Sequence, residues 1–329
     1  MKNALHEKPI IGITVGDHNG IGPEVVLKAL RHPSVMRICR PMLVGPAVVF
    51  EYYSRKLRIP LRAIPIVEIP SFPMSSVKIG TVTREAGRIA AGAIEAAVDL
   101  ARSGVIDAIV TAPISKQALH RAGSRFPGQT EMLQRLCRTR RVAMMLVSPT
   151  MKVGLVTIHI PIRNVARRIS RELIRERIEV IHRALVDDWA IRKPRLAVLG
   201  LNPHAGEGGD MGSEDRAIIG PTVKYLRESG MRIEGPFPAD SFFGRYTPGT
   251  YDAVIAMYHD QGLIPLKMSS FGNGVNVTAG LPIVRTSPDH GTAFDIAGRG
   301  IADPGSMIAA IVLAARIAHN RHRSQSHRR

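Results

Sequence analysis

Cysteine is scarce in this chain of 329 residues, which contains only Cys39 and Cys137. Two isolated cysteines fit neither a zinc-binding pattern nor a disulfide framework, so they favour a reducing compartment. Long apolar runs are also missing, because the longest one near the end, 307–315, is much shorter than a membrane span. Residues 1–9 are polar and carry no signal-peptide core. We therefore expect a soluble, cytoplasmic protein.

Aromatic residues make up only 5% of the chain, whereas its net charge is +18. Much of this charge lies in 163–195, with a net charge of +5, and in the tail 316–329, which has five arginines and no acidic residue. Basic surfaces attract polyanions, but nucleic-acid strands are usually bound with aromatic side chains as well, and the tail has none. The composition thus argues against a nucleic-acid partner and favours small anionic substrates. A polyanion-binding basic protein remains the alternative from another class.

Short apolar runs alternate with longer helical stretches along the chain. The runs that predict strands are 9–15, 40–45, 108–111, 143–147, 153–157, 196–200 and 253–257. The stretches that predict helices are 23–30, 83–103, 165–190 and 306–318. This alternation predicts an α/β protein with a largely parallel sheet. The length suits two subdomains, and because no linker separates them, we expect one to be inserted into the other.

No G-x-G-x-x-G fingerprint occurs in the sequence, so a standard Rossmann dinucleotide site is not supported. The glycine-rich turn 16–24 (GDHNGIGPE) could still bind an anion at the start of the following helix. The segments 111–116 (TAPISK) and 127–131 (PGQTE) could present hydroxyls, a lysine and an amide to a substrate. Taken singly, each segment is more typical of an ordinary loop.

Three histidines share one position relative to the predicted strands. His159, His204 and His259 each lie two to four residues after a predicted strand ends. Because parallel strands end at the same edge of a sheet, these imidazoles are expected to meet. Three imidazoles can bind a divalent cation and leave positions open for a substrate. A single such histidine is usually structural, but the three together predict a metal site, with a metal-dependent hydrolase as a rival interpretation.

Six ordered blocks make the chain similar to a known family over nearly its whole length. They are GDHNGIGPE, TAPISK, PGQTE, LNPHAGEGG, AMYHDQGLIPLK and GVNVTAGLPIVRTSPDHGTAFDIAGRG. These blocks resemble the 4-hydroxythreonine-4-phosphate dehydrogenase family, including its 4-phospho-threonate, 4-phospho-erythronate and terephthalate dihydrodiol dehydrogenase branches. The resemblance implies a three-layer α/β/α fold like that of isocitrate and isopropylmalate dehydrogenases, with two subdomains and a cleft between them. We expect 1–125 with 278–329 to bind the cofactor, and the inserted 126–277 to carry the substrate, metal and dimer contacts.

The resemblance also implies roles for individual residues. His159, His204 and His259 match the metal ligands of the family. The positions that match its contacts with substrate and phosphate are Gln129, Thr130, Lys267, Asn276 and Arg285. The site of the family forms between two subunits, so a homodimer is implied.

The last block is similar to the loop that the wider group of dehydrogenases wraps around adenosine. Asp295 falls where a carboxylate can accept hydrogen bonds from both ribose hydroxyls and would repel a 2′-phosphate, so NAD is expected rather than NADP. Further cofactor contacts are expected from His290, Gly291, Thr292 and Asp303. The simpler interpretation is that Asp295 caps a turn.

One position departs from the pattern of the family. Gln129 stands where many members have histidine, and glutamine can form hydrogen bonds but cannot carry charge. The substrate therefore stays open between phosphorylated threonate, erythronate or hydroxythreonine and an unphosphorylated cyclic diol with carboxylates. Lys267 and Arg285 suit a phosphate, but they could also bind a carboxylate.

Together these features predict an oxidative decarboxylation. A divalent cation (zinc, magnesium, manganese or cobalt) would polarise the substrate hydroxyl, a base would take its proton, and NAD would accept the hydride. The β-keto acid formed in this way would lose CO2. Lys116, Asp260 and Lys267 are the candidate catalytic residues, and the sequence does not choose the base among them.

Overall fold

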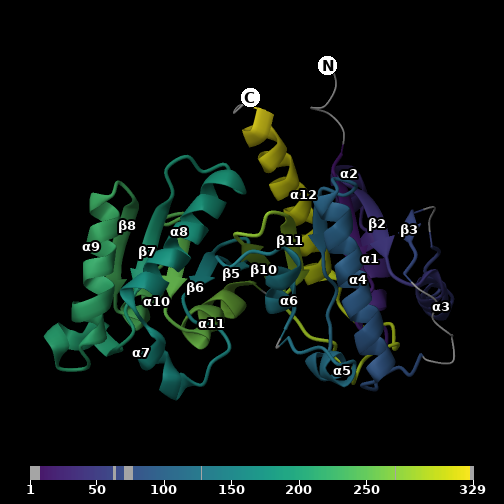
Figure 1. The fold of residues 1–329 in the computed structure, drawn as a ribbon, viewed down its shortest axis with the longest axis horizontal. Coiled ribbons are helices and arrows are strands. Elements are labelled where there is room, and N and C mark those ends of the chain that lie inside the picture. Colours follow the sequence, from purple (N-terminus) through teal and green to yellow (C-terminus); the bar gives the residue numbers. More distant parts are fainter. Residues whose placement is uncertain (1–7, 62–63, 70–76, 127, 271, 327–329) are drawn as a thin grey trace. The chain divides into compact units, whose positions relative to one another are not determined.

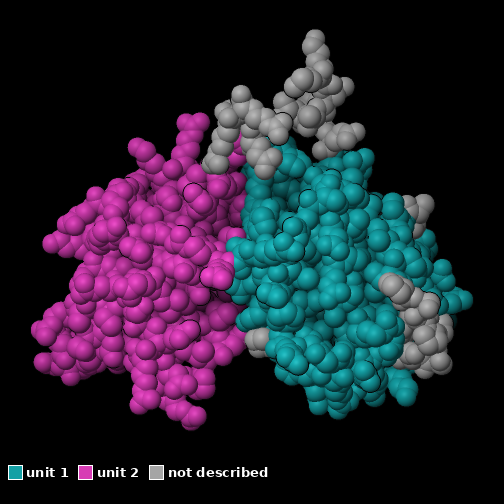
Figure 2. Space-filling view, viewed as in Figure 1, with its two compact units in different colours: residues 1–139, 281–323 teal, residues 140–280, 324–329 magenta. Residues whose placement is uncertain are grey.

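The computed structural model describes residues 8–61, 64–69, 77–126, 128–270 and 272–326 (Figure 1). It divides into unit 1, residues 1–139 with 281–323, and unit 2, residues 140–280 with 324–329 (Figure 2). The expected limits, 1–125 with 278–329 and 126–277, differ mainly at the first boundary, because 126–139 belong to unit 1. Pro127 of the PGQTE block and the last residues of the basic tail, 327–329, lie outside the described residues.

The sheet of unit 1 is parallel throughout. Its strands lie in the order β3 (Ile66–Val67), β2 (Arg40–Val44), β1 (Ile10–Thr14), β4 (Ala108–Val110) and β11 (Val284–Pro288). Ile11, Ile13 and Ile109 are completely buried, as expected for a parallel sheet that is covered on both faces. Polar segments follow β1, β4 and β11, so their carboxyl ends form the edge at which ligands are expected.

The helices of unit 1 connect and flank these strands (Figure 1). They are α1 (Gly22–Leu30), α2 (Pro33–Ile38), α3 (Ala47–Leu57), α4 (Arg84–Arg102), α5 (Lys116–Arg121), α6 (Gln129–Leu136) and α12 (Gly305–Ser326). In α4, Thr83 caps the start by accepting a hydrogen bond from Ala86 N at 3.1 Å. Its buried stripe includes Ile89 and Ile94, which gives the amphipathic period that the sequence shows.

The sheet of unit 2 is mixed. Its strands lie in the order β10 (Val275–Ala279), β5 (Ala143–Val147), β6 (Lys152–Leu155), β9 (Ala253–Ala256), β7 (Arg195–Leu199) and β8 (Arg232–Phe237). β5 is antiparallel to both of its neighbours, whereas β6, β9, β7 and β8 run parallel. The carboxyl ends of β6, β9 and β7 therefore meet at one edge, with β9 in the middle.

Unit 2 carries eight helical segments within its described residues. They are η2 (Ile162–Asn164), α7 (Val165–Arg168), α8 (Arg171–Asp187), η3 (Pro203–Gly209), η4 (Asp215–Ile219), α9 (Gly220–Glu228), α10 (Ala239–Gly244) and α11 (His259–Ser270). The apolar core lies between the sheet, α10 and α11, and it includes Leu146, Leu199 and Leu266.

The single helix expected over 165–190 is wrong, because the structure has two helices there. Ile169 is extended, with a ψ of 121°, and separates α7 from α8. Ser170 then caps α8 by accepting a hydrogen bond from Leu173 N at 3.2 Å. Serine favours this position because its hydroxyl competes with the helical backbone when it lies in the interior of a helix.

The α/β class and all the predicted strands are confirmed, whereas β3, β8, β10 and β11 were not predicted. β11 was not predicted because polar residues interrupt its apolar pattern. Two of them, Arg285 and Thr286, are nevertheless buried, and Thr286 Oγ1 donates to Ala310 O at 2.9 Å. None of the helices in the described part of the chain has the length and apolarity needed to cross a bilayer.

Gly87 allows the close approach of α4 and α5, because an added Cβ would overlap the backbone oxygen of Ala118. We expect Gly87→Ala to lower the free energy of unfolding by about 1–3 kcal/mol, although alanine is the better helix former. Gly92→Ala in the same helix is the matched control, since a Cβ there would lie 4.0 Å from the nearest neighbouring atom, on Ile69. Urea unfolding followed by circular dichroism measures both variants, and equal effects would contradict this account.

Candidate active site

The ends of β6, β9 and β7 are held together by two polar side chains. Thr157, after β6, donates through Oγ1 to Met257 O at 2.7 Å. Gln261 accepts a hydrogen bond from Met257 N at 2.7 Å and donates to Gly200 O, after β7, at 2.6 Å. These bonds fix the backbone from which the three candidate metal ligands project. Neither Thr157 nor Gln261 was assigned a role from the sequence, although Gln261 lies inside one of the six blocks.

Two of the three histidines lie side by side at this edge. The ring centroids of His159 and His259 are 5.8 Å apart, and the ring planes are inclined by 43°. His259 Nδ1 lies 2.7 Å from Asp260 Oδ1. With the proton on Nδ1, this bond fixes the tautomer of His259 and leaves its Nε2 available to a ligand.

His204 lies in a loop with an unusual backbone. His204, Ala205 and Glu207 have positive φ angles of 53°, 52° and 41°, and the intervening Gly206 and following Gly208 are also left-handed. Left-handed conformations cost non-glycine residues about 1–2 kcal/mol each, so the surrounding contacts must hold this loop. His204 is exposed. Among the described residues, no group of three or more histidine, cysteine, aspartate or glutamate side chains is arranged to hold a metal ion, so one chain brings together two of the three predicted ligands.

Asp215 holds the start of this loop. Its side chain is buried and accepts hydrogen bonds from Leu201 N at 2.8 Å, Asn202 N at 3.1 Å and Asn202 Nδ2 at 2.9 Å. Asn202 Nδ2 also donates to Glu214 at 2.9 Å. No sequence pattern indicates this role, because Asp215 follows the block that contains His204 and has no recognisable spacing from it.

A buried arginine forms the centre of the candidate anion site in unit 1. Arg285 is 3% exposed and donates to Thr111 Oγ1 from Nε at 3.0 Å and from a terminal nitrogen at 2.7 Å. It also donates to Gln129 Oε1, which accepts a second bond from Thr111 Oγ1 at 2.6 Å. Burial lowers the pKa of Arg285 to about 10. Thr111 and Gln129 are neutral, so they orient the guanidinium without cancelling its charge.

The other predicted substrate contacts lie in both units. Thr130 is in the first turn of α6, and Lys116 is the first residue of α5. Lys116 lies beside the start of α6, because its Cε would be 3.6 Å from a Cβ added to Gly128. In unit 2, Lys267 is exposed on α11, and Asn276 lies on β10 with a buried Oδ1 that has no hydrogen-bond partner among the described residues.

The predicted cofactor loop follows β11 and packs against the turn after β1. Ile21 N donates to Thr292 O at 2.9 Å, and a Cβ on Gly20 would lie only 2.7 Å from the same oxygen. His290 Nε2 and Asp17 Oδ2 are buried atoms without a hydrogen-bond partner among the described residues. Unsatisfied buried polar atoms are costly and need a partner, so this loop fits a ligand that forms hydrogen bonds.

The two aspartates expected to contact the cofactor are both exposed. Asp295 lies in the turn that follows Thr292. Asp303 Oδ1 accepts a hydrogen bond from Gly305 N at 2.9 Å and thus caps α12. This capping bond was not predicted from the sequence, and the cofactor role of Asp303 stays a prediction.

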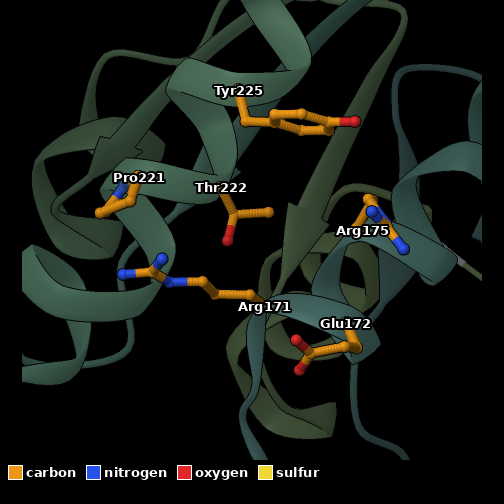
Figure 3. Close-up of a pocket in the computed structure, with 6 residues that line it drawn as sticks. All are labelled: Arg171, Glu172, Arg175, Pro221, Thr222 and Tyr225. Carbon is orange, nitrogen blue, oxygen red and sulfur yellow. The ribbon is translucent and has the colours of Figure 1, made fainter.

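A surface pocket of about 220 Å³ lies elsewhere, between α8 and α9 of unit 2 (Figure 3). It is lined by Arg171, Glu172, Arg175, Pro221, Thr222 and Tyr225. None of the predicted site residues lines it. We therefore place the candidate active site at the strand ends instead.

Comparison with known proteins gives consistent matches along the chain. Residues 37–314 match the family described as Pyridoxal phosphate biosynthetic protein PdxA. The D-threonate 4-phosphate dehydrogenase of Cupriavidus necator is 46% identical, over 95% of this chain and 98% of its own length. A crystal structure of a 4-hydroxythreonine-4-phosphate dehydrogenase from Burkholderia phymatum is similar with a TM-score of 0.81 and 43% identity, over 95% of this chain and 99% of that one. A terephthalate 1,2-cis-dihydrodiol dehydrogenase from Burkholderia xenovorans LB400 is similar with a TM-score of 0.67 and 30% identity, over 94% and 98%.

Asp17 gives a testable dependence of stability on pH. Burial raises the pKa of Asp17 from 3.8 to about 6, and a hydrogen bond from Asn19 N to Oδ1 opposes the rise. The folded protein therefore binds this proton more tightly than the unfolded chain, so Asp17 destabilises the fold above pH 6 and the penalty vanishes as the pH falls below about 4. We expect Asp17→Asn to raise the free energy of unfolding by about 3 kcal/mol at pH 8 and to leave it unchanged at pH 3.5.

Urea unfolding at pH 3.5, 6 and 8 measures this dependence. Asp99→Asn on the exposed face of α4 is the control, because it removes a carboxylate without changing a buried one. If Asp17→Asn raised the free energy of unfolding equally at all three pH values, the raised pKa of Asp17 would be contradicted.

Proposed function

Because the chain belongs to the family of pyridoxal phosphate biosynthetic proteins PdxA, we propose that it is a dehydrogenase for the hydroxyl group of a phosphorylated four-carbon hydroxy acid. NAD would accept the hydride, a divalent metal ion would assist, and the β-keto product would lose CO2. The family predicted from the six sequence blocks is confirmed. The observation that carries the proposal is the pairing of His159 with His259 where β6 and β9 end, with Asp260 holding one of the rings.

The metal ion would be held by His159, His259 and His204. One chain fits this role in part, since two of the imidazoles are adjacent and the third lies in the loop after the neighbouring strand. When bound, such an ion supplies Lewis-acid polarisation of a hydroxyl or carbonyl oxygen. Among zinc, cobalt, magnesium and manganese, zinc suits imidazole donors better than magnesium or manganese.

The anionic group of the substrate would bind at Arg285. Its guanidinium is held in one orientation by Thr111 and Gln129, which removes the entropic cost of ordering it when the anion binds. Thr130, in the adjacent turn, would add a hydroxyl group. The substrate contacts expected from Lys267 and Asn276 stay predictions.

The base that takes the hydroxyl proton would be a lysine. Asp260 Oδ1 is engaged with His259 Nδ1, which favours an orienting role for Asp260 over direct proton removal. Lys116 and Lys267 remain as the candidates for this base.

The substrate class favoured here is a 4-phosphorylated threonate. The relative named D-threonate 4-phosphate dehydrogenase covers 95% of the chain at 46% identity, whereas the terephthalate dihydrodiol dehydrogenase is 30% identical. Gln129 is neutral, whereas a histidine at this position could carry a positive charge. Arg285 must therefore supply more of the attraction to a phosphate. A cyclic diol with carboxylates and a polyanion are the alternative ligands, which the activity test described below distinguishes.

The dinucleotide would lie along the loop from His290 to Asp295. The exposed carboxylate of Asp295 is available to ribose hydroxyls, and Gly291 and Thr292 would contact the cofactor through their backbone. Repulsion between Asp295 and a 2′-phosphate would select NAD over NADP.

A second copy of the chain is the proposed partner. Ile264 and Met268 on α11 are 58% and 74% exposed, and Ile162, just after His159, is 74% exposed. Apolar side chains that flank a candidate site in this way are typical of a protein interface. Their position beside the histidines favours a homodimer in which the partner subunit helps to complete the metal site.

The reaction can be tested by NADH formation. We expect turnover of 4-phospho-D-threonate, 4-phospho-erythronate or 4-hydroxythreonine 4-phosphate, loss of activity on metal removal, and recovery on adding zinc or cobalt. His259→Ala should reduce kcat/KM at least about 100-fold, whereas His182→Ala on α8 should not. NADH formation only from a terephthalate dihydrodiol, or full activity of metal-free protein, would contradict the proposal. Salt-dependent polyanion binding without any NADH formation would favour the basic-protein alternative.

The homodimer can be tested by light scattering after size-exclusion chromatography. Charges placed on an apolar interface are costly to bury, so Ile264→Glu combined with Met268→Glu should convert a dimer to a monomer. Val105→Glu in unit 1 is the control, because Val105 is also an exposed apolar residue. A wild-type monomer, or a double variant that stays dimeric, would refute this interface.

A further inference from the structure

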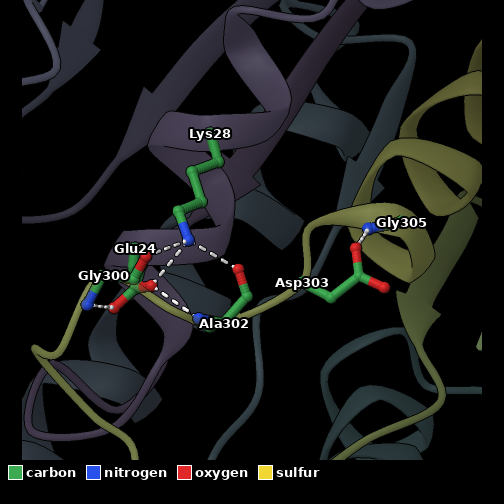
Figure 4. Close-up of polar contacts among 6 residues, drawn as sticks. All are labelled: Glu24, Lys28, Gly300, Ala302, Asp303 and Gly305. Atoms are coloured by element: carbon green, nitrogen blue, oxygen red, sulfur yellow. Dashed lines mark hydrogen bonds and ion pairs between the residues drawn. The ribbon is translucent and has the colours of Figure 1, made fainter.

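Glu24 and Lys28, one turn apart on α1, join that helix to the segment that ends the predicted cofactor loop (Figure 4). Glu24 is completely buried and accepts hydrogen bonds from Gly300 N at 3.3 Å and Ala302 N at 2.8 Å. Lys28 Nζ donates to Glu24 at 2.9 Å, to Gly300 O at 2.9 Å and to Ala302 O at 2.7 Å. Both backbone polar groups of Gly300 and of Ala302 are thus bound by this one ion pair.

Three groups of hydrogen bonds tie the loop from residue 289 to 302 to other described residues. At its start, Asp289 N donates to Ser306 Oγ at 3.0 Å. Three residues further on, Thr292 O accepts the hydrogen bond from Ile21 N. At its end lies the Glu24–Lys28 pair. Two of the three groups therefore come from the short stretch 21–28, which begins inside the glycine-rich turn of the first sequence block.

The rest of the loop has little internal support. Between Thr292 and Gly300 its backbone forms short-range turns, in which Ile296 N donates to Ala293 O at 3.2 Å and Arg299 N to Ile296 O at 3.2 Å. Ala293 has a positive φ of 40°, which a non-glycine residue adopts only when its surroundings impose it. The middle of the loop also packs against its surroundings, since a Cβ on Gly298 would lie 2.9 Å from Ile79 and 3.0 Å from Lys56. The hydrogen bonds at the two ends of the loop add to this packing in holding the conformation around Asp295.

We propose that Glu24 and Lys28 are positioning residues for the dinucleotide: they set the conformation of the loop 290–300 without touching the cofactor. This inference rests on the proposed NAD-binding role of that loop. It assigns a purpose to the first sequence block other than direct anion binding: its helix is the support on which the cofactor loop is built. Because the buried carboxylate of Glu24 needs a cation, Lys28 is the member whose removal loosens the segment.

Lys28→Met is the test variant, since Lys28 is 21% exposed and methionine can occupy much of the same space. Hydrogen exchange of the protein without cofactor should rise about tenfold in the peptide that contains the Gly300 and Ala302 amides. The KM for NAD should rise about tenfold, with kcat changed less than about twofold, because the lost contact orders the loop before the cofactor binds. Lys28→Arg, which keeps the charge and donors, should restore most of both properties.

Lys224→Met is the matched control, because Lys224 forms an ion pair of the same spacing with Glu228 on the exposed face of α9. It should change neither hydrogen exchange of the loop nor the KM for NAD. A purely structural role of Lys28 would lower thermal stability while leaving the KM for NAD at the wild-type value, and that result would overturn the proposal. Unchanged exchange at Gly300 and Ala302 would also overturn it. If wild-type protein does not bind NAD, the proposed function fails, and the exchange measurement still decides whether Lys28 holds the loop.

Discussion

Gln261 joins the ends of two parallel strands, and the candidate metal site depends on this link. β9 lies between β6 and β7, so a residue that follows β9 is the one that can reach both neighbours. Gln261 bonds its own strand at Met257 and the next strand at Gly200, and Thr157 bonds Met257 from the other side. His259 is thereby placed between the segments that carry His159 and His204, although only His159 approaches it within one chain.

In unit 1, too, residues at or near the ends of parallel strands position a candidate site, but this site suits an anion instead of a metal ion. Here Thr111, just after β4, orients Arg285 of β11, and the loop after β11 packs against the turn after β1. The neutral oxygen atoms of Thr111 and Gln129 orient Arg285, which is the residue that we propose binds an anion. In the ion pair on α1, by contrast, Glu24 and Lys28 neutralise each other. Their remaining hydrogen bonds are formed with the backbone of the loop. The charge pair on α1 thus supports the structure, whereas Arg285 is the residue that we propose binds an anion.

The sequence predicted the elements whose patterns are local. The apolar strands and α4 follow from periodicity, and the family follows from the six blocks. The break at Ser170 was missed, because an apolar period continues across it. β11 was missed because burial of Arg285 and Thr286 depends on partners far away in the sequence. The same reason explains why the support from Gln261, Asp215 and Lys28 could not be predicted: their partners lie 61, 14 and 272 residues away. Left-handed backbone at His204 and Ala205 also has no signal in residue type.

X-ray absorption spectroscopy of zinc-loaded protein shows whether His159 and His259 bind the metal ion. We expect a first shell that contains at least two imidazole nitrogens at about 2.0–2.1 Å, with the outer-shell scattering that identifies histidine. Replacing His159 and His259 together should remove that scattering. A shell of oxygen or sulfur ligands, or an imidazole signal that persists without these two residues, would contradict the account.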